Sequence, residues 1–466
     1  MRWTDMIADI MDFWHEFRQV KSGIVSVVLL CGFVAAIVLE PYLIPFPEAG
    51  SRWRDITYWE ENPRSAPPVW INWFSSKKRA KSQTLHEQTR SEKQAGKVRI
   101  LKVGFSYIYS ADIPPLDMLF HGQVTGSPVV VLTVERPDGE KIRLLKKSVS
   151  NTDRQNIRIS VAKDAIPAIS RFASKYAGSY GQQTQDMLRR PITIIFSQAQ
   201  SGMRQTPSPL HGTYMITAEI LLPREDDRIE NLSLALPGSV SGWLGTDNSK
   251  RDIGSGVIAG IKWALLIGLL TAVVAVSIGV IYGVMSAYWG GWRDSLMQRV
   301  FEIFVSIPLL PLLIVMSAIF KPSIWTLVGM MSAFFWVGPV KTVRSMGLQI
   351  KEETYIEASK AFGASSLRII FKHMIPLLIP YAFASMALYV PGAIVYESTI
   401  SLLGLGDSTI VTWGQILHDA LSGGAVLNGQ WWWVIPPGLA IALMGMTFAF
   451  LGFAMDTILH PKLRTR

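Results

Sequence analysis

The chain has 466 residues, of which 49% are hydrophobic and 17% are charged. This composition is too apolar for an ordinary soluble protein and too polar for a chain that lies in the membrane throughout, so we expect membrane spans combined with a soluble domain. Basic residues that flank apolar spans explain the net charge of +10, and we expect no nucleic-acid partner. The single cysteine, Cys31, excludes an intramolecular disulfide and a cysteine-based metal cluster.

The N-terminal part of the chain predicts a membrane anchor. Residues 1–23 place apolar side chains at near-helical spacing among charged ones, which is typical of an interfacial helix. The apolar run 24–44 is long enough for a first span in contact with the lipid bilayer. A cleavable signal peptide is the alternative, but the acidic leader and the lack of a small-x-small cleavage site argue against it.

Residues 45–251 contain no run long enough to cross a bilayer and therefore predict a separate inserted domain. Its basic, polar segment 76–102 is expected to be an exposed arm. The remaining pattern favours an α+β or β-rich, sandwich-like fold. We expect strands at 99–110, 128–135, 141–149, 192–198 and 212–222, a helix at 162–176, and a hairpin turn at Arg136-Pro-Asp-Gly.

Five further apolar runs follow, each about as long as a bilayer requires. With the first span they predict an α-helical polytopic membrane protein with about six transmembrane helices, five of them in a core at 252–456. Prolines 308 and 311 are expected to kink the third span, and three glycines, Gly268, Gly279 and Gly283, to allow close packing of the second. The five runs are 256–286, 297–320, 324–340, 374–396 and 432–456.

The distribution of basic residues predicts the topology. The loop 341–373 is rich in lysine and arginine, whereas 398–431 contains neither, so the first is expected to be cytoplasmic. Six spans then place the N-terminus and the tail 457–466 in the cytoplasm and 45–251 outside. We therefore expect a multi-pass protein of the cell membrane.

The cytoplasmic loop holds the stretch EETYIEASKAFGASSLRIIFKHMIP, residues 352–376. A helix over 353–362 should end at Gly363, and Ser365 or Ser366 should cap a second helix that continues through Pro376 into the next span. Small side chains crowd the turn, so the surface of another protein could approach its backbone closely. The alternative is an amphipathic helix that lies on lipid headgroups.

The spacing of Glu357-Ala358-Ser359, Gly363 and Ile375-Pro376 resembles the EAA motif of ATP-binding-cassette importer permeases, whose loop docks into a groove of the ATPase subunit. Ser359 stands where the family has alanine. His373 replaces an isoleucine, as in the oligopeptide/dipeptide branch. The resemblance implies ATPase-coupling roles for Glu357, Ala358, Ser359, Ala361, Gly363 and Ala364.

Further motifs resemble the C-type permeases of that branch in the same order. They are Gly-Trp-Leu-Gly-Thr-Asp from Gly242, Tyr-Trp-Gly-Gly-Trp from Tyr288, Glu-Ser-Thr-Ile-Ser-Leu-Leu-Gly-Leu-Gly from Glu397, Trp413-Gly414, and Asp456 through Arg464. The resemblance implies a type I importer permease fold that forms half of a pathway for di- or oligopeptides. It also implies three kinds of partner: a homologous B-type permease, two ATP-binding subunits and an extracytoplasmic solute-binding protein.

Candidate residues for other chemistry are few. No G-x-x-x-x-G-K-[ST] phosphate loop occurs, so we expect no catalytic residue and no cofactor in this chain, with ATP and magnesium on the partner ATPase subunits. Histidines lack metal-ligand clustering, and no metal site is expected. Glu302 and Glu397 at the span edges are expected to be structural, and Trp431-Trp432-Trp433 to form an interfacial belt. Substrate-binding residues cannot be assigned.

Three other functions are compatible with parts of the pattern. An ion-gradient-driven secondary transporter would favour paired ionisable residues inside the membrane and internal inverted repeats, neither of which is clear in this sequence. An importer of the same family for nickel or sugars would share the motifs. A membrane-anchored receptor would leave five spans without a purpose.

Overall fold

A computed structural model describes residues 15–96, 98–149, 152–176 and 191–459. The chain forms two compact units, a helical unit with residues up to Arg54 and from Ser255 onward, and a second unit, Asp55–Gly254. The insertion was expected to begin at residue 45. In the structure, residues 45–54 belong to the helical unit, where Ala49 and Trp53 are buried. Most of the predicted N-terminal helix, residues 1–14, lies outside the described residues.

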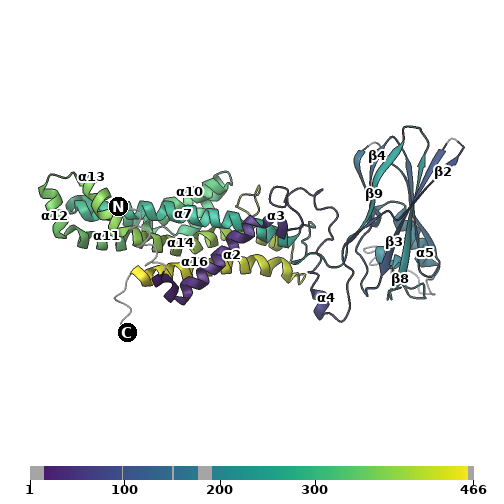
Figure 1. The fold of residues 1–466 in the computed structure, drawn as a ribbon, viewed down its shortest axis with the longest axis horizontal. Coiled ribbons are helices and arrows are strands. Elements are labelled where there is room, and N and C mark those ends of the chain that lie inside the picture. The colour runs from purple at the N-terminus through teal and green to yellow at the C-terminus, as the bar shows by residue number, and fades with distance from the viewer. Residues whose placement is uncertain (1–14, 97, 150–151, 177–190, 460–466) are drawn as a thin grey trace. The chain divides into compact units, whose positions relative to one another are not determined.

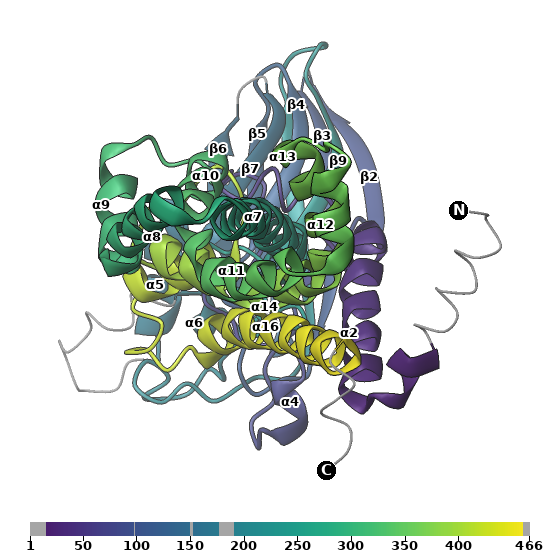
Figure 2. The ribbon, with the colours of Figure 1, turned by 90° about the vertical axis from the view of Figure 1, so that its left-hand side faces the viewer.

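The helical unit is a bundle of long apolar helices (Figures 1 and 2). Its elements are α2 (Lys21–Val38), α3 (Glu40–Leu43), α7 (Ile253–Trp289), α8 (Gly291–Ser306), α9 (Leu309–Ile319), α10 (Ile324–Phe335), α11 (Val337–Lys351), α12 (Thr354–Ala361), α13 (Ser366–Arg368), the π-helical turn η3 (Ile369–Met374), α14 (Ile375–Leu402), α15 (Trp413–Ser422) and α16 (Trp431–Leu459).

Five helices among the described residues are long and apolar enough to cross a membrane, or six if the bent pair α8 and α9 is one span. That pair replaces the single span expected at 297–320. Its axis turns by 77° where Ile307 and Pro308 separate the two helices. Proline lacks the N–H that would continue the hydrogen-bond ladder of α8. The kink predicted at Pro308 is therefore present, and it is a full break.

Two spans extend further than expected. The helix that begins at Ile324 continues to Lys351, past the expected end at residue 340, because 341–351 contains no proline and its one glycine, Gly347, packs against Ala287. Likewise, α14 continues to Leu402, so Glu397 lies inside the helix instead of at its edge. The predicted loop 341–373 thus begins as helix.

Helix α7 lies among the other helices of the unit (Figure 2). A Cβ atom at Gly268, Gly279 or Gly283 would come within 2.8 Å of atoms in α14 or α11. The absence of a side chain therefore lets neighbouring helices pack closely against α7, as predicted for these glycines.

The second unit consists of two antiparallel sheets around one core (Figure 1). The four-stranded sheet has the order β1-β9-β4-β7 and the five-stranded sheet β2-β3-β8-β5-β6. The strands are β1 (Gln83–His86), β2 (Thr89–Ala95), β3 (Val98–Tyr109), β4 (Leu119–Thr125), β5 (Val129–Glu135), β6 (Lys141–Ser148), β7 (Thr152–Arg158), β8 (Gly212–Leu222) and β9 (Arg228–Leu236). The short helices are α4 (Ile71–Phe74), η1 (Ile159–Val161), α5 (Ala165–Ser174) and α6 (Pro191–Ile195).

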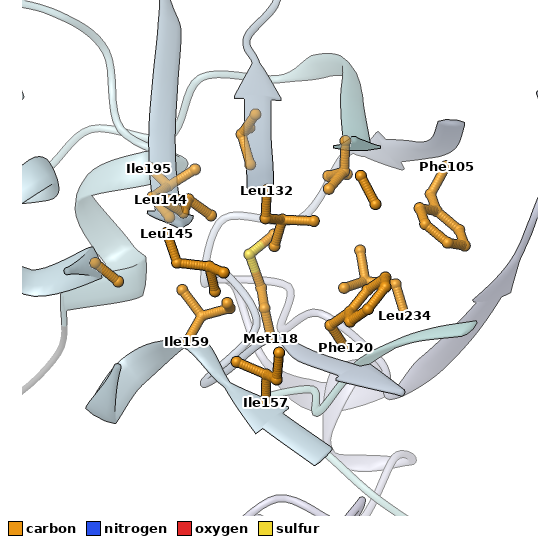
Figure 3. Packing of buried hydrophobic residues seen from close by; sticks show 14 of the residues in the cluster. Phe105, Met118, Phe120, Leu132, Leu144, Leu145, Ile157, Ile159, Ile195 and Leu234 are labelled. Carbon is orange, nitrogen blue, oxygen red and sulfur yellow. The ribbon is translucent and has the colours of Figure 1, made fainter. Parts of the chain in front are cut away.

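Alternating burial along the strands builds this core. Leu132 in β5 and Phe105 in β3 of one sheet, and Phe120 in β4 and Leu234 in β9 of the other, are fully buried in the same cluster (Figure 3). Because strand side chains alternate between faces, each sheet turns one apolar face to the other. The unit is a β-sandwich with α5 packed against it.

One predicted strand is wrong. Residues 192–198 were expected to be extended because Ile192, Ile194 and Ile195 are β-branched. In the structure the first four of these residues lie in α6, Ser197 forms only an isolated bridge to Pro209, and all three isoleucines are buried. Pro191 occupies the first position of α6, where its fixed φ favours a helix and its missing N–H costs nothing. Because this segment is buried on all sides, its apolar residues do not have to alternate with polar ones.

Candidate coupling site

Helix α12 ends in a Schellman motif at the glycine expected to end it. Gly363 has φ of +79°. Its N–H donates to the Lys360 carbonyl at 2.9 Å, and the N–H of Ala364 donates to the Ser359 carbonyl at 3.1 Å. These two bonds satisfy carbonyls that the end of a helix leaves without partners. The Ser365 hydroxyl then accepts from the Arg368 N–H at 3.4 Å and caps the next helix, as predicted.

One buried side chain anchors α12 to the bundle. Ile356 is fully buried in a cluster with Val343 of α11 and with Ile369, Ile370 and Met374 of η3. The exposed and buried faces of α12 are therefore fixed by this contact. This contact attaches α12 to the bundle between α11 and η3.

The six residues assigned to coupling lie together on and just after α12. Glu357, Ala358, Ala361 and Gly363 are exposed, while Ser359 and Ala364 are half-buried. A Cβ atom built at Gly363 would meet no heavy atom within 4 Å. The space beside the turn is therefore open, and only the left-handed backbone restricts the residue at this position.

Sequence reasoning missed an apolar rim beside these small residues. Phe362 is 92% exposed, and Leu367, Phe371 and Tyr355 are also exposed. Exposed apolar side chains that are grouped on one surface are available to contact another molecule. The helical pattern alone assigns apolar residues to a buried face, which is why these four were not singled out.

Two of the sequence motifs meet at this site. The Lys360 Nζ lies 5.5 Å from the centre of the Tyr288 ring, and Tyr288 opens the Tyr-Trp-Gly-Gly-Trp motif. In that motif, Gly290 and Gly291 both have positive φ and form the sharp turn between α7 and α8. The Lys351 ammonium donates to the Ala287 carbonyl at 3.3 Å. The C-terminal end of α7 is thus linked to α12.

An ion pair and its hydrogen bonds connect three helices, α7, α8 and α11. Arg344 of α11 binds the Asp294 carboxylate of α8 through Nε at 2.8 Å and Nη2 at 2.5 Å. The Ser286 hydroxyl of α7 donates to the same carboxylate and accepts from Gln298 at 3.0 Å. Bidentate geometry orients both partners. Three helices are therefore fixed to one another next to α12.

The other candidate residues have structural environments. Glu302 pairs with Arg299 at 2.9 Å on an exposed face of α8. Glu397 is buried and accepts hydrogen bonds from Ser398 at 3.2 Å and Ser401 at 2.7 Å. Of the expected tryptophan belt, Trp432 and Trp433 are buried, which leaves Trp431 as the more exposed member. Within the described ranges, no group of three or more His, Cys, Asp or Glu residues could hold a metal ion.

An apolar groove of about 400 Å³ lies between α7 and the helix formed by η3 and α14. Its lining includes Val280 and Ile281 on one side and Phe371, Ile375 and Phe383 on the other. Its lining has no charged side chain that could pair with the ends of a peptide, and Ser277 supplies its hydroxyl group.

Comparison with known proteins identifies the family. Residues 275–465 match the model for the binding-protein-dependent transport system inner membrane component. The dipeptide transport system permease protein DppC of Bacillus subtilis is 37% identical over 288 residues, which cover 60% of this chain and 89% of the relative. The oligopeptide transport system permease protein OppC of Haemophilus influenzae is 34% identical over 47% of this chain and 70% of its own length.

Among solved structures, a chain from the inward-facing MetNI methionine ABC transporter matches 45% of this chain and 97% of its own length. The identity is 18% and the TM-score 0.34, a likeness too weak for a detailed comparison of the folds. The sequence relatives, together with several membrane-spanning helices, carry the assignment. The chain is a multi-pass inner-membrane permease subunit and belongs to the oligopeptide/dipeptide permease family of ATP-binding-cassette importers.

Proposed function

We propose that this chain forms half of a translocation pathway for di- or oligopeptides and that α12 couples the pathway to ATP hydrolysis on partner subunits. The observation that carries the proposal is the surface of α12. Small exposed residues lie next to a left-handed Gly363, an exposed Phe362 lies beside them, and buried Ile356 attaches the helix to the bundle. A groove on an ATPase subunit could receive this surface. The peptide substrate is inferred from the names of the relatives.

The remaining components follow from the same family. They are a homologous B-type permease, two ATP-binding subunits that hold ATP and magnesium, and an extracytoplasmic solute-binding protein. The basic residues of 341–373 support a cytoplasmic position for α12 and for both termini, with the second unit outside. The chain itself is a permease and not an enzyme.

Co-purification tests the docking role of α12. We expect Phe362→Ser to reduce the amount of ATPase subunits recovered with the permease, because an exposed ring lost from an interface costs binding and little stability. Leu427→Ser is the matched control, since Leu427 is also 92% exposed but lies between α15 and α16. Replacement of Glu357 should also weaken recovery. If the Phe362 and Leu427 variants both retain the ATPase subunits equally well, α12 is not the docking element.

For the second unit, we propose a role in receiving the solute-binding protein or in covering the pore mouth. A folded unit tethered to spans at both ends raises the effective concentration of any protein that it binds there. The alternative is a spacer without contact to cargo or binding protein. Residues 55–252 should be replaced by a short linker, while Trp53 and Arg54 are kept because they belong to the helical unit. Transport should fall at low binding-protein concentration and recover at high concentration, whereas a spacer would leave this dependence unchanged.

A further inference from the structure

Three aromatic side chains are exposed around α4 of the second unit. Trp73, Phe74 and Trp243 are 73%, 81% and 75% exposed, and together they define what we call the α4 patch. Helix α4 stands at the tip of a loop, clear of the two sheets (Figure 1). Aromatic side chains exposed to this degree are uncommon on a surface that faces only water. These rings are therefore available to a partner outside this unit.

The patch is built by specific contacts. The indole N–H of Trp70 donates to the Trp243 carbonyl at 2.8 Å, and its ring lies edge-on to Phe74 with centroids 6.4 Å apart. The Val69 N–H donates to the Gly242 carbonyl at 3.0 Å. Two chain segments far apart in the sequence are thereby held side by side. Their exposed rings are presented as one surface.

Exposed lysines follow the rings of α4 along the chain. Lys77, Lys78 and Lys81 are exposed directly after α4. The Lys78 ammonium donates to the carbonyls of Asn72 at 2.5 Å and Ser75 at 3.4 Å and so closes the C-terminal end of α4. Two acidic groups lie close by: the Asp112 carboxylate accepts the backbone N–H of Lys78 at 2.8 Å, and Asp252 is buried beside Gly242. The fully exposed charges next to α4 are those of the lysines, and the exposed charge there is therefore positive.

Hydrogen bonds inside the same unit connect the patch to the first residue of a membrane span. The Ile253 N–H, at the start of α7, donates to the Gly245 carbonyl at 3.0 Å. Gly245 lies two residues after Trp243, and Gly242 and Gly245 both have positive φ, which makes this connection a tight turn. The patch is thus attached to the point where the chain enters α7.

We propose that the α4 patch is a membrane-surface anchor, with its rings among the headgroups of the outer leaflet and its lysines on the lipid phosphates. Tryptophan and lysine together are typical of the membrane interface. Lysine is depleted in protein–protein interfaces, which favours lipid over a protein partner. The assignment to the outer leaflet rests on the proposed orientation. The anchor would hold the second unit near the bilayer independently of the solute-binding protein.

A spin label on the full chain in lipid nanodiscs tests directly whether the α4 patch lies at the membrane surface. The single native cysteine is removed as Cys31→Ser, and the label is attached at Ser76→Cys, an exposed site that leaves the rings and lysines intact. Ile108→Cys, 75% exposed on β3 of the same unit, is the matched control. We expect the label at 76 to be more accessible to oxygen and less accessible to a water-soluble nickel chelate than the label at 108.

Variants then separate the contributions of the aromatic rings and of the lysines to membrane binding. Trp73→Ala combined with Trp243→Ala should return the label at 76 to the aqueous accessibility seen at 108. Lys77→Gln with Lys81→Gln should have a larger effect in nanodiscs that contain phosphatidylglycerol than in phosphatidylcholine alone. Lys78 is left unchanged because its ammonium group caps the C-terminal end of α4. The readout requires neither transport nor ATP hydrolysis, so it is independent of the proposed function.

Two results would overturn the proposal. In the first, the label at 76 is as exposed to water as the label at 108 in both lipid mixtures. In the second, the label at 76 is protected only after a purified solute-binding protein or the second permease is added, which would make the patch a protein-binding surface instead.

Discussion

Arg54 is held by Asp419 of α15: its Nη1 lies 3.1 Å from each oxygen of the carboxylate, and its Nη2 donates to Gln415 at 3.0 Å. Arg54 is the last residue of the helical unit before the insertion begins. On its other side, α15 approaches α14 closely, because Gly414 packs against Ser398 and Ser401. Arg54, the residue just before the insertion, is thus connected through α15 to α14, the helix that carries Glu397.

The Arg54–Asp419 pair should be measurable as a coupling energy. We expect Arg54→Ala to lower the free energy of unfolding by about 0.5–1 kcal/mol, since Arg54 is partly exposed and its ion pair is screened by water. Arg54→Lys should recover only part of this, because lysine cannot reproduce the planar fork. A double-mutant cycle with Asp419→Ala, followed by thermal unfolding in detergent, gives the value. A coupling energy of zero would show that the two side chains act independently.

Gly363 should control coupling through its backbone conformation. Gly363→Val places a β-branched residue at φ of +79°, which costs about 1–2 kcal/mol in the turn itself. We expect ATP hydrolysis to continue and transport to fall in vesicles that contain the partner subunits. Gly363→Asn should retain more transport, because asparagine tolerates the left-handed region. Normal transport by the valine variant would contradict the docking role of the turn.

Glu397 should contribute to stability through its hydrogen bonds inside the bundle. Glu397→Ala leaves the hydroxyls of Ser398 and Ser401 without this acceptor and is expected to cost about 1–3 kcal/mol. Glu397→Gln keeps the shape and one acceptor oxygen and should cost less. Thermal unfolding of both variants in the same detergent measures the difference. Equal stability of the alanine and glutamine variants would rule out a role for these hydrogen bonds.

Lys250 should make the stability of the second unit depend on pH. Burial, with a smaller contribution from nearby Arg158, lowers the pKa of Lys250 from 10.5 to about 8. Between these two values the unfolded chain binds more protons, so the free energy of unfolding should rise as the pH increases through this range. Lys250→Gly should remove this rise and stabilise the unit near pH 7, since glycine also accepts the φ of +68° at this position. An unchanged slope of melting temperature against pH would contradict the assignment.

The membrane part could be predicted because its signals are local. Apolar runs act through the hydropathy of their side chains, and Pro308 and Gly363 act through backbone conformation, so a single sequence reveals all of these signals. The second unit was harder. Strands β4 and β9 were missed because their alternation is interrupted, by a shift of register next to Gly122 in β4 and by positive φ at Asn231 in β9. Strand β2 was missed because it is an exposed edge strand made of polar residues.

The turn at Gly363 was predicted, but the apolar side chains exposed beside it were not. Its glycine and small residues follow from the motif. The apolar rim depends on which side of α12 the buried Ile356 fixes against η3, a tertiary contact that periodicity cannot supply. The α4 patch was not predicted for a similar reason. Trp73 and Trp243 are 170 residues apart in the sequence, and the contacts of Trp70 bring their two segments together.

Peptide uptake into sealed proteoliposomes tests the central claim most directly. The vesicles would contain this chain with its partner permease and two ATPase subunits, the binding protein and a labelled dipeptide or oligopeptide would be outside, and ATP would be enclosed. We predict accumulation that requires ATP and binding protein and that Gly363→Val abolishes while ATP hydrolysis persists. Uptake that proceeds without the ATPase subunits, driven by a proton or sodium gradient, would contradict the account.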